Sequence, residues 1–252
     1  MTSKDVTPHF FKHDAAAIVQ ELGSAVLVDL LKQMVLIRQF EFRAEAMYQQ
    51  GKVGGFLHLY IGQEAIQTAA VKALGRNHWW TTTYRCHALA ILLGETPHSL
   101  MAELFGKATG NALGRGGSMH MFSNRMLGGF GIVAGQIPIA TGAAFSCKYL
   151  KSKDEISVCF FGDGAVANGV FHECLNIASM WELPCLYVIE NNKWSMGTPL
   201  CRTMANYRHF PEKAAASYDM PYFRLDGMDL LNCYAGFQTI TNQKLDLKRR
   251  IG

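Results

Sequence analysis

The chain has 252 residues, of which 49% are hydrophobic and 17% charged, so it can build a sizeable core and is not intrinsically disordered. Its net charge of +4 is mild and its basic residues are scattered, which argues against a nucleic-acid partner. No apolar run is long enough to cross a bilayer, and residues 1–14 resemble neither a secretion nor an import signal. We therefore expect a cytoplasmic protein without a membrane partner.

The seven cysteines form no Cys-x-x-Cys pair, and several lie inside apolar segments. This pattern is typical of reduced core residues and not of a disulfide framework or a zinc site. It agrees with a reducing compartment.

The first third of the chain predicts an arm followed by helices and one strand. Residues 1–24 are polar and are expected to form a loose, irregular arm. Residues 25–50 carry apolar side chains at helical spacing before Gly51, which predicts a long helix covering one face of a sheet. Its predicted buried face consists of Leu27, Leu30, Leu31, Met34, Ile37 and Glu41. Further helices are predicted at 65–74, 87–93 and 97–105, and a strand at 79–83.

Two segments between these elements carry polar side chains that could take part in binding or catalysis. His58 lies in an apolar segment, where a histidine is more often a core residue than a functional one. Tyr84 and Arg85 directly follow the 79–83 strand. A guanidinium can bind two oxygens of an anion and a tyrosine hydroxyl can donate one more hydrogen bond, although a surface ion pair is the alternative.

Residues 106–135 contain nine of the 24 glycines, together with Arg115 and His120. An irregular loop of this length is usually functional or disordered, and we expect a loop here. Residues 136–150 then predict an apolar helix whose small side chains permit close packing.

The stretch from residue 156 to residue 189 predicts strand, helix and strand. The runs at 156–161 and 185–189 are short and rich in β-branched and aromatic residues, as buried strands are. Asn168 and Gly169 begin the intervening helix. One of its faces is apolar and consists of Phe171, Cys174, Leu175, Ala178 and Trp181. Such a βαβ unit has parallel strands, so the predicted fold class is α/β, with a parallel sheet flanked by helices.

Polar residues follow both strands of this unit. Asp163 comes after the first strand, and Asn191 and Asn192 come after the second. Ligands of open parallel sheets bind beyond the carboxyl ends of the strands, so these oxygens are expected to face one crevice. Carboxylate and amide oxygens suit Mg²⁺, which fills its shell with phosphate oxygens and water. Gly164 permits close approach of a ligand, and a helix N-terminus beside it would add donors for an anion.

Gly162-Asp163-Gly164, followed after residues 165–190 by Asn191-Asn192, resembles the thiamine diphosphate signature. The wider text Phe-Phe-Gly-Asp-Gly-Ala and Glu-Asn-Asn-Lys-Trp-Ser-Met-Gly-Thr is similar to the alpha subunits of two-subunit 2-oxoacid dehydrogenases, with the pyruvate branch the most similar. The resemblance covers roughly residues 25–230. A βαβ turn that binds nothing is the alternative.

The resemblance implies a thiamine diphosphate-binding fold and a role for each matching residue. His58 would lie at the reacting end of the cofactor, as a proton donor or a group that orients the substrate. Arg115 and His120 would lie in a loop along the route to the active site, with open roles. The Mg²⁺ ligands would be Asp163, Asn192 and the Trp194 carbonyl. The residues that contact thiamine diphosphate would be Tyr84, Arg85, Gly131, Val133, Asp163, Gly164, Ala165 and Asn192.

The resemblance also implies an activity and partners. The activity would be oxidative decarboxylation of a small 2-oxoacid, pyruvate first, with acyl transfer to a lipoyl-bearing acyltransferase. A beta subunit would complete the site in a heterotetramer, because the glutamate that activates the cofactor belongs to that subunit. Branched-chain 2-oxoacid and acetoin dehydrogenases are alternatives within the class.

The end of the chain carries a weaker resemblance. Residues 226–229 are similar to a segment of the family where a further strand ends. Members of the family continue with a histidine-containing loop, so residues 25–252 are expected to form a thiamine diphosphate-binding dehydrogenase domain that is incomplete at its C-terminus. A non-catalytic partner of the beta subunit is the alternative from another functional class.

Overall fold

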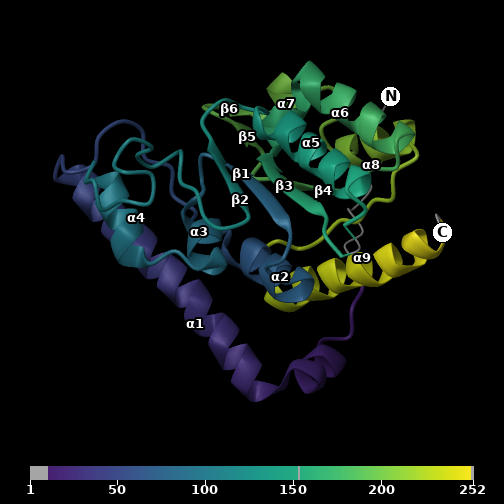
Figure 1. The fold of residues 1–252 in the computed structure, drawn as a ribbon, viewed down its shortest axis with the longest axis horizontal. Coiled ribbons are helices and arrows are strands. Elements are labelled where there is room, and N and C mark those ends of the chain that lie inside the picture. Colours follow the sequence, from purple (N-terminus) through teal and green to yellow (C-terminus); the bar gives the residue numbers. More distant parts are fainter. Residues whose placement is uncertain (1–10, 153, 251–252) are drawn as a thin grey trace.

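The computed structural model describes residues 11–152 and 154–250, with side chains described as far as residue 240. At its centre lies a four-stranded parallel sheet with the strand order β2-β1-β3-β4. The strands are β1 (Trp79–Thr83), β2 (Met126–Phe130), β3 (Ser157–Gly162) and β4 (Cys185–Glu190). Helices cover both faces of this sheet, which confirms the predicted α/β fold class (Figure 1).

The helices account for most of the remaining chain. They are α1 (Ala15–Gln49), α2 (Glu64–Leu74), α3 (His87–Leu93), α4 (Pro97–Leu104), α5 (Gln136–Tyr149), α6 (Gly169–Met180), α7 (Leu200–Thr203), α8 (Phe210–Ser217) and α9 (Leu230–Arg250). A 3₁₀ turn, η1 (Asp163–Ala167), follows β3, and two short strands, β5 (Trp194–Ser195) and β6 (Thr198–Pro199), form an antiparallel pair. Among the helices described, none has the length and apolar character needed to cross a membrane.

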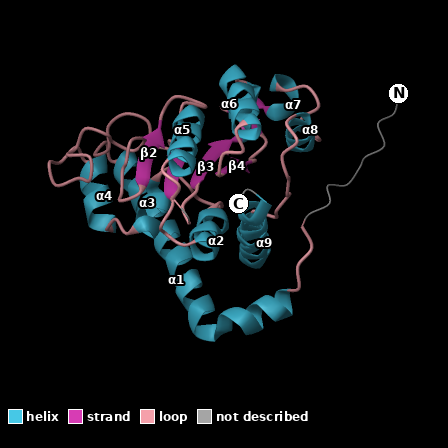
Figure 2. Cartoon of the chain, turned by 45° about the vertical axis from the view of Figure 1, so that its right-hand side comes forward, coloured by secondary structure: helices cyan, strands magenta, loops and turns pink. Residues whose placement is uncertain are grey.

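Alternate side chains of β3 enter different cores. Val158 and Phe160 pack into the cluster shared with α2, α3 and α9, whereas Cys159 and Phe161 pack into the cluster shared with α5 and α6. A strand covered on both faces buries side chains on each of them, and this is why the 156–161 run lacks a polar alternation. Figure 2 shows α5 and α6 on one side of the sheet and α2 and α9 on the other.

The predicted irregular arm is wrong over its second half. Helix α1 begins at Ala15, where the Asp14 carboxylate caps it by accepting a hydrogen bond from the Ala17 main chain at 3.1 Å. Gly23, with φ 72° and ψ 159°, then kinks the helix, and the bend is visible in Figure 2. Glu21 accepts a hydrogen bond from Gln238 on α9 at 2.7 Å, so a distant helix supports this turn. Residues 1–10 of the predicted arm lie outside the described residues.

Helix α1 also packs differently from the prediction. It lies against α2, α3, α4 and α9, so it forms a layer outside the helices that cover the sheet. Leu30, Ile37 and Glu41 are buried as predicted, but Leu31 is 58% exposed because the buried face is rotated away from it.

The predicted loop over residues 106–135 contains a strand. Met126–Phe130 forms β2, the edge strand beside β1. Its third and fourth residues are glycines, which weaken any strand signal in the sequence. Gly129 is required by space, since a Cβ there would lie 2.6 Å from the Cβ of Cys86 and from the main-chain oxygen of Met119.

Smaller differences lie in the last third of the chain. The described residues 221–226 form no strand, and the Asp229 carboxylate instead starts α9 by accepting a hydrogen bond from the Leu231 main chain at 2.8 Å. On α6, Trp181 is 47% exposed, whereas the other predicted apolar residues are buried. All seven cysteines are free as predicted, although Cys201 is exposed.

The stacked pair Trp80 and Phe160 gives a test of the core between the sheet and α2. The two rings are fully buried, with centroids 6.2 Å apart and planes within 7°. We expect Phe160→Ala to lower the free energy of unfolding by about 3–5 kcal/mol, because the side chain is lost and a cavity remains. Urea unfolding measures this change. Phe56→Ala, at a side chain that is 72% exposed, is the control and should stay within about 0.5 kcal/mol of the parent.

Candidate active site

All four strands of the sheet end at the same edge, and each is followed by predicted ligand residues. Because β2, β1, β3 and β4 run parallel, their carboxyl ends lie side by side. Residues 131–133 follow β2, and residues 84–85 follow β1. Residues 163–165 follow β3, and residues 191–194 follow β4. The fold thus gathers segments separated by up to 110 residues along one edge, where open parallel sheets bind ligands.

Asp163 is held by main-chain donors. One carboxylate oxygen accepts from the Gly164 N–H at 2.9 Å and the other from the Lys193 N–H at 2.7 Å. The second bond joins the tip of β3 to the turn after β4. In that turn the Asn192 side chain accepts from the Trp194 N–H at 2.9 Å, and the Asn191 side chain accepts from the Lys193 N–H at 3.0 Å.

Burial raises the pKa of Asp163, which is 4% exposed. The N–H groups of Lys193 and Gly164 and the charge of Arg85 act in the opposite direction. No lysine or arginine within the described residues forms an ion pair with this carboxyl group among the contacts shorter than 4.0 Å. A cation at the strand tip would therefore stabilise the ionised form.

The turn after β4 explains the second glycine of the motif. A Cβ on Gly164 would lie 2.7 Å from the Ser195 hydroxyl oxygen, so only glycine fits while β5 stays in place. Ala165 beside it is 3% exposed, and Trp194 in β5 is 52% exposed. The predicted helix N-terminus beside Gly164 is wrong, because the 3₁₀ turn η1 occupies 163–167 and α6 begins only at Gly169, capped by Asn168.

His58, Tyr84 and Arg85 form one group. The His58 ring lies against the Tyr84 ring with centroids 4.2 Å apart, and Arg85 donates through Nε to the Leu59 main-chain oxygen at 3.0 Å. Burial lowers the pKa of His58, and the charges of Arg85 and His87 lower it further. Its buried Nδ1 has no hydrogen-bond partner among the described residues. A neutral imidazole with an unpartnered nitrogen is suited to contact a bound molecule.

A buried polar cluster, absent from the sequence analysis, lies beneath this group. Tyr60 donates its hydroxyl hydrogen to Glu190, and Gln67 donates to the same Glu190 oxygen at 3.3 Å. Burial raises the pKa of Glu190 to about 7, although hydrogen bonds from Tyr60 and Gln67 and the charge of Arg85 lower it. The sequence placed Glu190 next to Asn191 but gave no signal that its carboxyl group is buried.

The first part of the glycine-rich segment is fixed by another buried carboxylate. Glu103 on α4, fully buried, accepts four main-chain N–H hydrogen bonds at 2.7–3.1 Å. The donors are Ala112, Gly114, Gly116 and Gly117. Charge-assisted bonds to successive main-chain groups fix the course of a loop that has little apolar content of its own.

This loop brings His120 to the end of β2. A Cβ on Gly131 would lie 3.2 Å from the His120 ring, so the imidazole lies directly against the main chain of Gly131. Nδ1 of His120 is 3.2 Å from the Gly116 main-chain oxygen. Val133 is 47% exposed and Arg115 is exposed. Residues 134–137 then pack with Phe161 and Ala165, which joins the β2 tip to the β3 tip.

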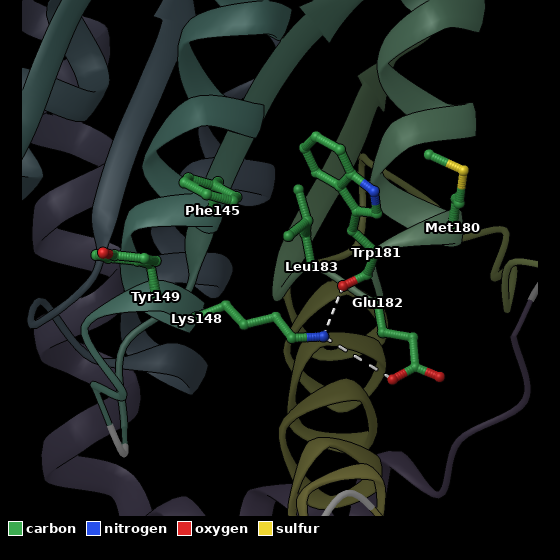
Figure 3. A pocket seen from close by; sticks show the side chains of 7 residues that line it. All are labelled: Phe145, Lys148, Tyr149, Met180, Trp181, Glu182 and Leu183. Carbon is green, nitrogen blue, oxygen red and sulfur yellow. Dashed lines mark hydrogen bonds and ion pairs between the residues drawn. The ribbon is translucent and has the colours of Figure 1, made fainter.

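An apolar hollow elsewhere on the surface is separate from these strand tips. Figure 3 shows it between the C-terminal ends of α5 and α6, where Lys148 donates to the Trp181 main-chain oxygen at 2.7 Å. Both helices begin near the strand tips and end at the opposite edge of the sheet. The hollow is lined by Phe145, Lys148, Tyr149, Met180, Trp181, Glu182 and Leu183. It contributes no residue to the candidate site.

Residues 32–243 match the family described as Dehydrogenase E1 component. The chain belongs to this family. Among curated relatives of this E1 component, the alpha-3 subunit of pyruvate dehydrogenase E1, chloroplastic, of Oryza sativa subsp. japonica is 43% identical over 239 residues. The alpha subunits of pyruvate dehydrogenase E1 of Porphyra purpurea and Rickettsia prowazekii are 46% and 44% identical over 217 and 211 residues.

These alignments cover 91%, 81% and 83% of this chain, in that order, but only 56%, 61% and 64% of the relatives. The chain therefore spans little more than half the length of the E1 alpha subunits it matches. Membership of the E1 component family confirms the resemblance identified from the Gly-Asp-Gly and Asn-Asn motifs.

The raised pKa of Glu190 predicts a pH-dependent stability. The group titrates near 4.5 when unperturbed and near 7 in the fold, so the folded chain binds a proton that the unfolded chain has released. The contribution of the protonated Glu190 carboxyl group to the free energy of unfolding is complete below pH 4.5 and is lost as the pH rises through 7. Glu190→Gln should remove this loss, because the amide does not titrate. The free energy of unfolding of the variant minus that of the parent should therefore increase by about 3 kcal/mol from pH 4.5 to pH 8.

Urea unfolding of both chains across that range measures the difference. Glu173→Gln, at an exposed position on α6, is the control and should follow the parent. An equal pH dependence in the parent and in Glu190→Gln would show that Glu190 keeps an ordinary pKa in the fold.

Proposed function

We propose that this chain is the alpha-type component of a thiamine diphosphate- and Mg²⁺-dependent 2-oxoacid dehydrogenase, with pyruvate as substrate. The observation that carries the proposal is the gathering of the four ligand segments at adjacent carboxyl ends of one parallel sheet. Family membership and the names of the relatives support it. The resulting activity is that of an oxidoreductase acting on the oxo group of the substrate.

The residues at the β3 and β4 tips fit a magnesium-bound diphosphate. Asp163 is a buried carboxylate that accepts hydrogen bonds from the main-chain N–H groups of Gly164 and Lys193, so each of its oxygens retains lone-pair capacity for a cation. Among the described side chains, no group of three or more His, Cys, Asp or Glu residues could hold a metal ion. A hard cation here would take its other ligands from Asn192, the Trp194 carbonyl, water and phosphate oxygens.

The other segments fit the rest of the cofactor. Tyr84 and Arg85 would hold the diphosphate, since the guanidinium offers paired donors and a fixed positive charge. Gly131 and Val133 would present main-chain groups to the aminopyrimidine ring, and Gly164 and Ala165 would allow close approach of the diphosphate. When bound, thiamine diphosphate supplies the electron sink for decarboxylation.

His58 is the proposed catalytic residue. Its lowered pKa keeps the imidazole neutral near pH 7, and its unpartnered Nδ1 is available to a proton or to a substrate oxygen. The adjacent Tyr84 ring fixes the imidazole beside the proposed diphosphate-binding pair.

The proposed partners follow from the similarity to E1 alpha subunits. A beta subunit would complete the site in a heterotetramer, and a lipoyl-bearing acyltransferase would accept the acyl group. We propose pyruvate before branched-chain 2-oxoacids or acetoin because the three relatives described above are named as pyruvate dehydrogenase alpha subunits. A decarboxylation assay of the complex with each substrate distinguishes these choices.

Removal of the proposed metal ligand tests the cofactor site. Asp163→Ala, in the full chain complexed with its beta subunit, should abolish Mg²⁺-dependent binding of thiamine diphosphate, because the cation loses its charged protein ligand. Isothermal titration calorimetry with and without Mg²⁺ measures this binding. Asp29→Ala, at an exposed carboxylate on α1, is the control. Unchanged cofactor affinity in Asp163→Ala would exclude the proposed metal site.

Substitution of His58 tests its catalytic role. His58→Gln should lower kcat about 10²- to 10⁴-fold while the affinity for thiamine diphosphate changes little, because a proton-transferring group is lost and the diphosphate contacts remain. Steady-state kinetics combined with calorimetric titration separates the two effects. His172→Gln, at an exposed histidine on α6, should retain the parental kcat. A parental kcat in His58→Gln would assign His58 to packing alone.

A further inference from the structure

We propose that Tyr60 is a positioning residue, which through its hydrogen bond to Glu190 fixes the diphosphate-binding Arg85 relative to the metal-binding tip of β4. The inference rests on the proposed function and deepens it. Neither Tyr60 nor Glu190 was among the residues predicted from the sequence.

Three buried side chains form the cluster. Tyr60 and Gln67 are fully buried and Glu190 is 5% exposed. One Glu190 oxygen accepts from the Tyr60 hydroxyl and, at 3.3 Å, from the Gln67 amide. Gln67 also donates to the Thr82 hydroxyl at 3.4 Å. The cluster therefore connects the segment before α2, helix α2 itself, the end of β4 and the end of β1.

Residues of the cluster are close in sequence to residues that hold the proposed cofactor-binding groups. Leu59, adjacent to Tyr60, accepts the hydrogen bond from Arg85 Nε at 3.0 Å. His58, two residues from Tyr60, lies against Tyr84. On the other strand tip, Glu190 ends β4, and Asn192 follows after one residue. A shift of the Tyr60 side chain would therefore move the main chain that holds Arg85.

The far end of the same segment is anchored independently. The Gly62 N–H donates to Glu64 at 3.1 and 3.2 Å, and Glu64 pairs with Arg38 of α1 through two hydrogen bonds of 2.5 and 2.9 Å. Tyr60 therefore fixes the end of this segment that lies nearer the candidate site, whereas the hydrogen bonds of Gly62 fix the end nearer α2. Loss of its hydroxyl would leave the buried Glu190 carboxyl group with Gln67 as its side-chain donor, and the segment would move to restore a partner.

A matched pair of substitutions separates positioning from stability. Tyr60→Phe removes one buried hydroxyl and keeps the ring. Tyr187→Phe also removes one hydroxyl and keeps the ring, at a half-buried position on β4, where the Tyr187 hydroxyl lies 2.6 Å from Thr141 in the cluster with α5, away from the strand tips. In the complex of the full chain with its beta subunit, Tyr60→Phe should raise the Kd of Mg²⁺–thiamine diphosphate tenfold or more. Tyr187→Phe should leave the Kd within twofold of the parental value.

A double substitution tests whether Tyr60 acts through Arg85. In an Arg85→Lys background, where the contact with Leu59 is already altered, Tyr60→Phe should raise the Kd less than twofold further. Calorimetric titration gives all four Kd values, and urea unfolding reports the stability of each variant. A purely structural role of Tyr60 predicts a loss of stability in Tyr60→Phe and no selective effect on the Kd.

The outcomes separate this inference from the proposed function. A parental Kd in Tyr60→Phe, or a full tenfold rise in the Arg85→Lys background, overturns the positioning role while the cofactor site stands. If the unsubstituted complex binds no thiamine diphosphate with Mg²⁺, the proposed function fails and the positioning role fails with it.

Discussion

The parallel arrangement of the four central strands is the constraint on which the candidate site depends. Each strand ends at the same edge, so the segment after each strand reaches that edge without a long connection. Both faces of β3 are covered by helices, and Asp163 directly follows its last residue, Gly162. The order of the four segments along this edge therefore follows the order of the strands in the sheet.

A single positive charge then organises the polar groups at this edge. The charge of Arg85 acts against burial at Asp163 and Glu190, whose pKa values burial raises, and acts together with burial at His58, whose pKa both lower. Its guanidinium is held by the Leu59 main chain and not by a carboxylate, so its charge is not neutralised by direct pairing at Nε. The proposed anionic diphosphate would be held by this charge and by the cation at Asp163.

The glycine-rich segment shows how buried carboxylates replace apolar packing. Glu103 gathers four main-chain N–H groups, and a His87–Glu41 pair, fully buried, contacts Ser118 from the other side of the loop. These contacts bring His120 against Gly131 at the β2 tip. They come from α1, α3 and α4, so the position of the loop depends on the outer helices as much as on the sheet.

Short apolar runs, helical spacing and the Gly-Asp-Gly and Asn-Asn motifs are local patterns, and they were enough to predict the α/β class, the parallel βαβ unit, most element positions and the family. Other features follow from contacts between distant parts of the chain. The strand β2 and the buried cluster of Tyr60, Gln67 and Glu190 depend on partners far away in the chain, whereas the Asp14 cap that starts α1 is local. Glycines at 128 and 129 hide a strand from local propensity, and burial of a carboxyl group is set by its neighbours in space, which no local pattern encodes.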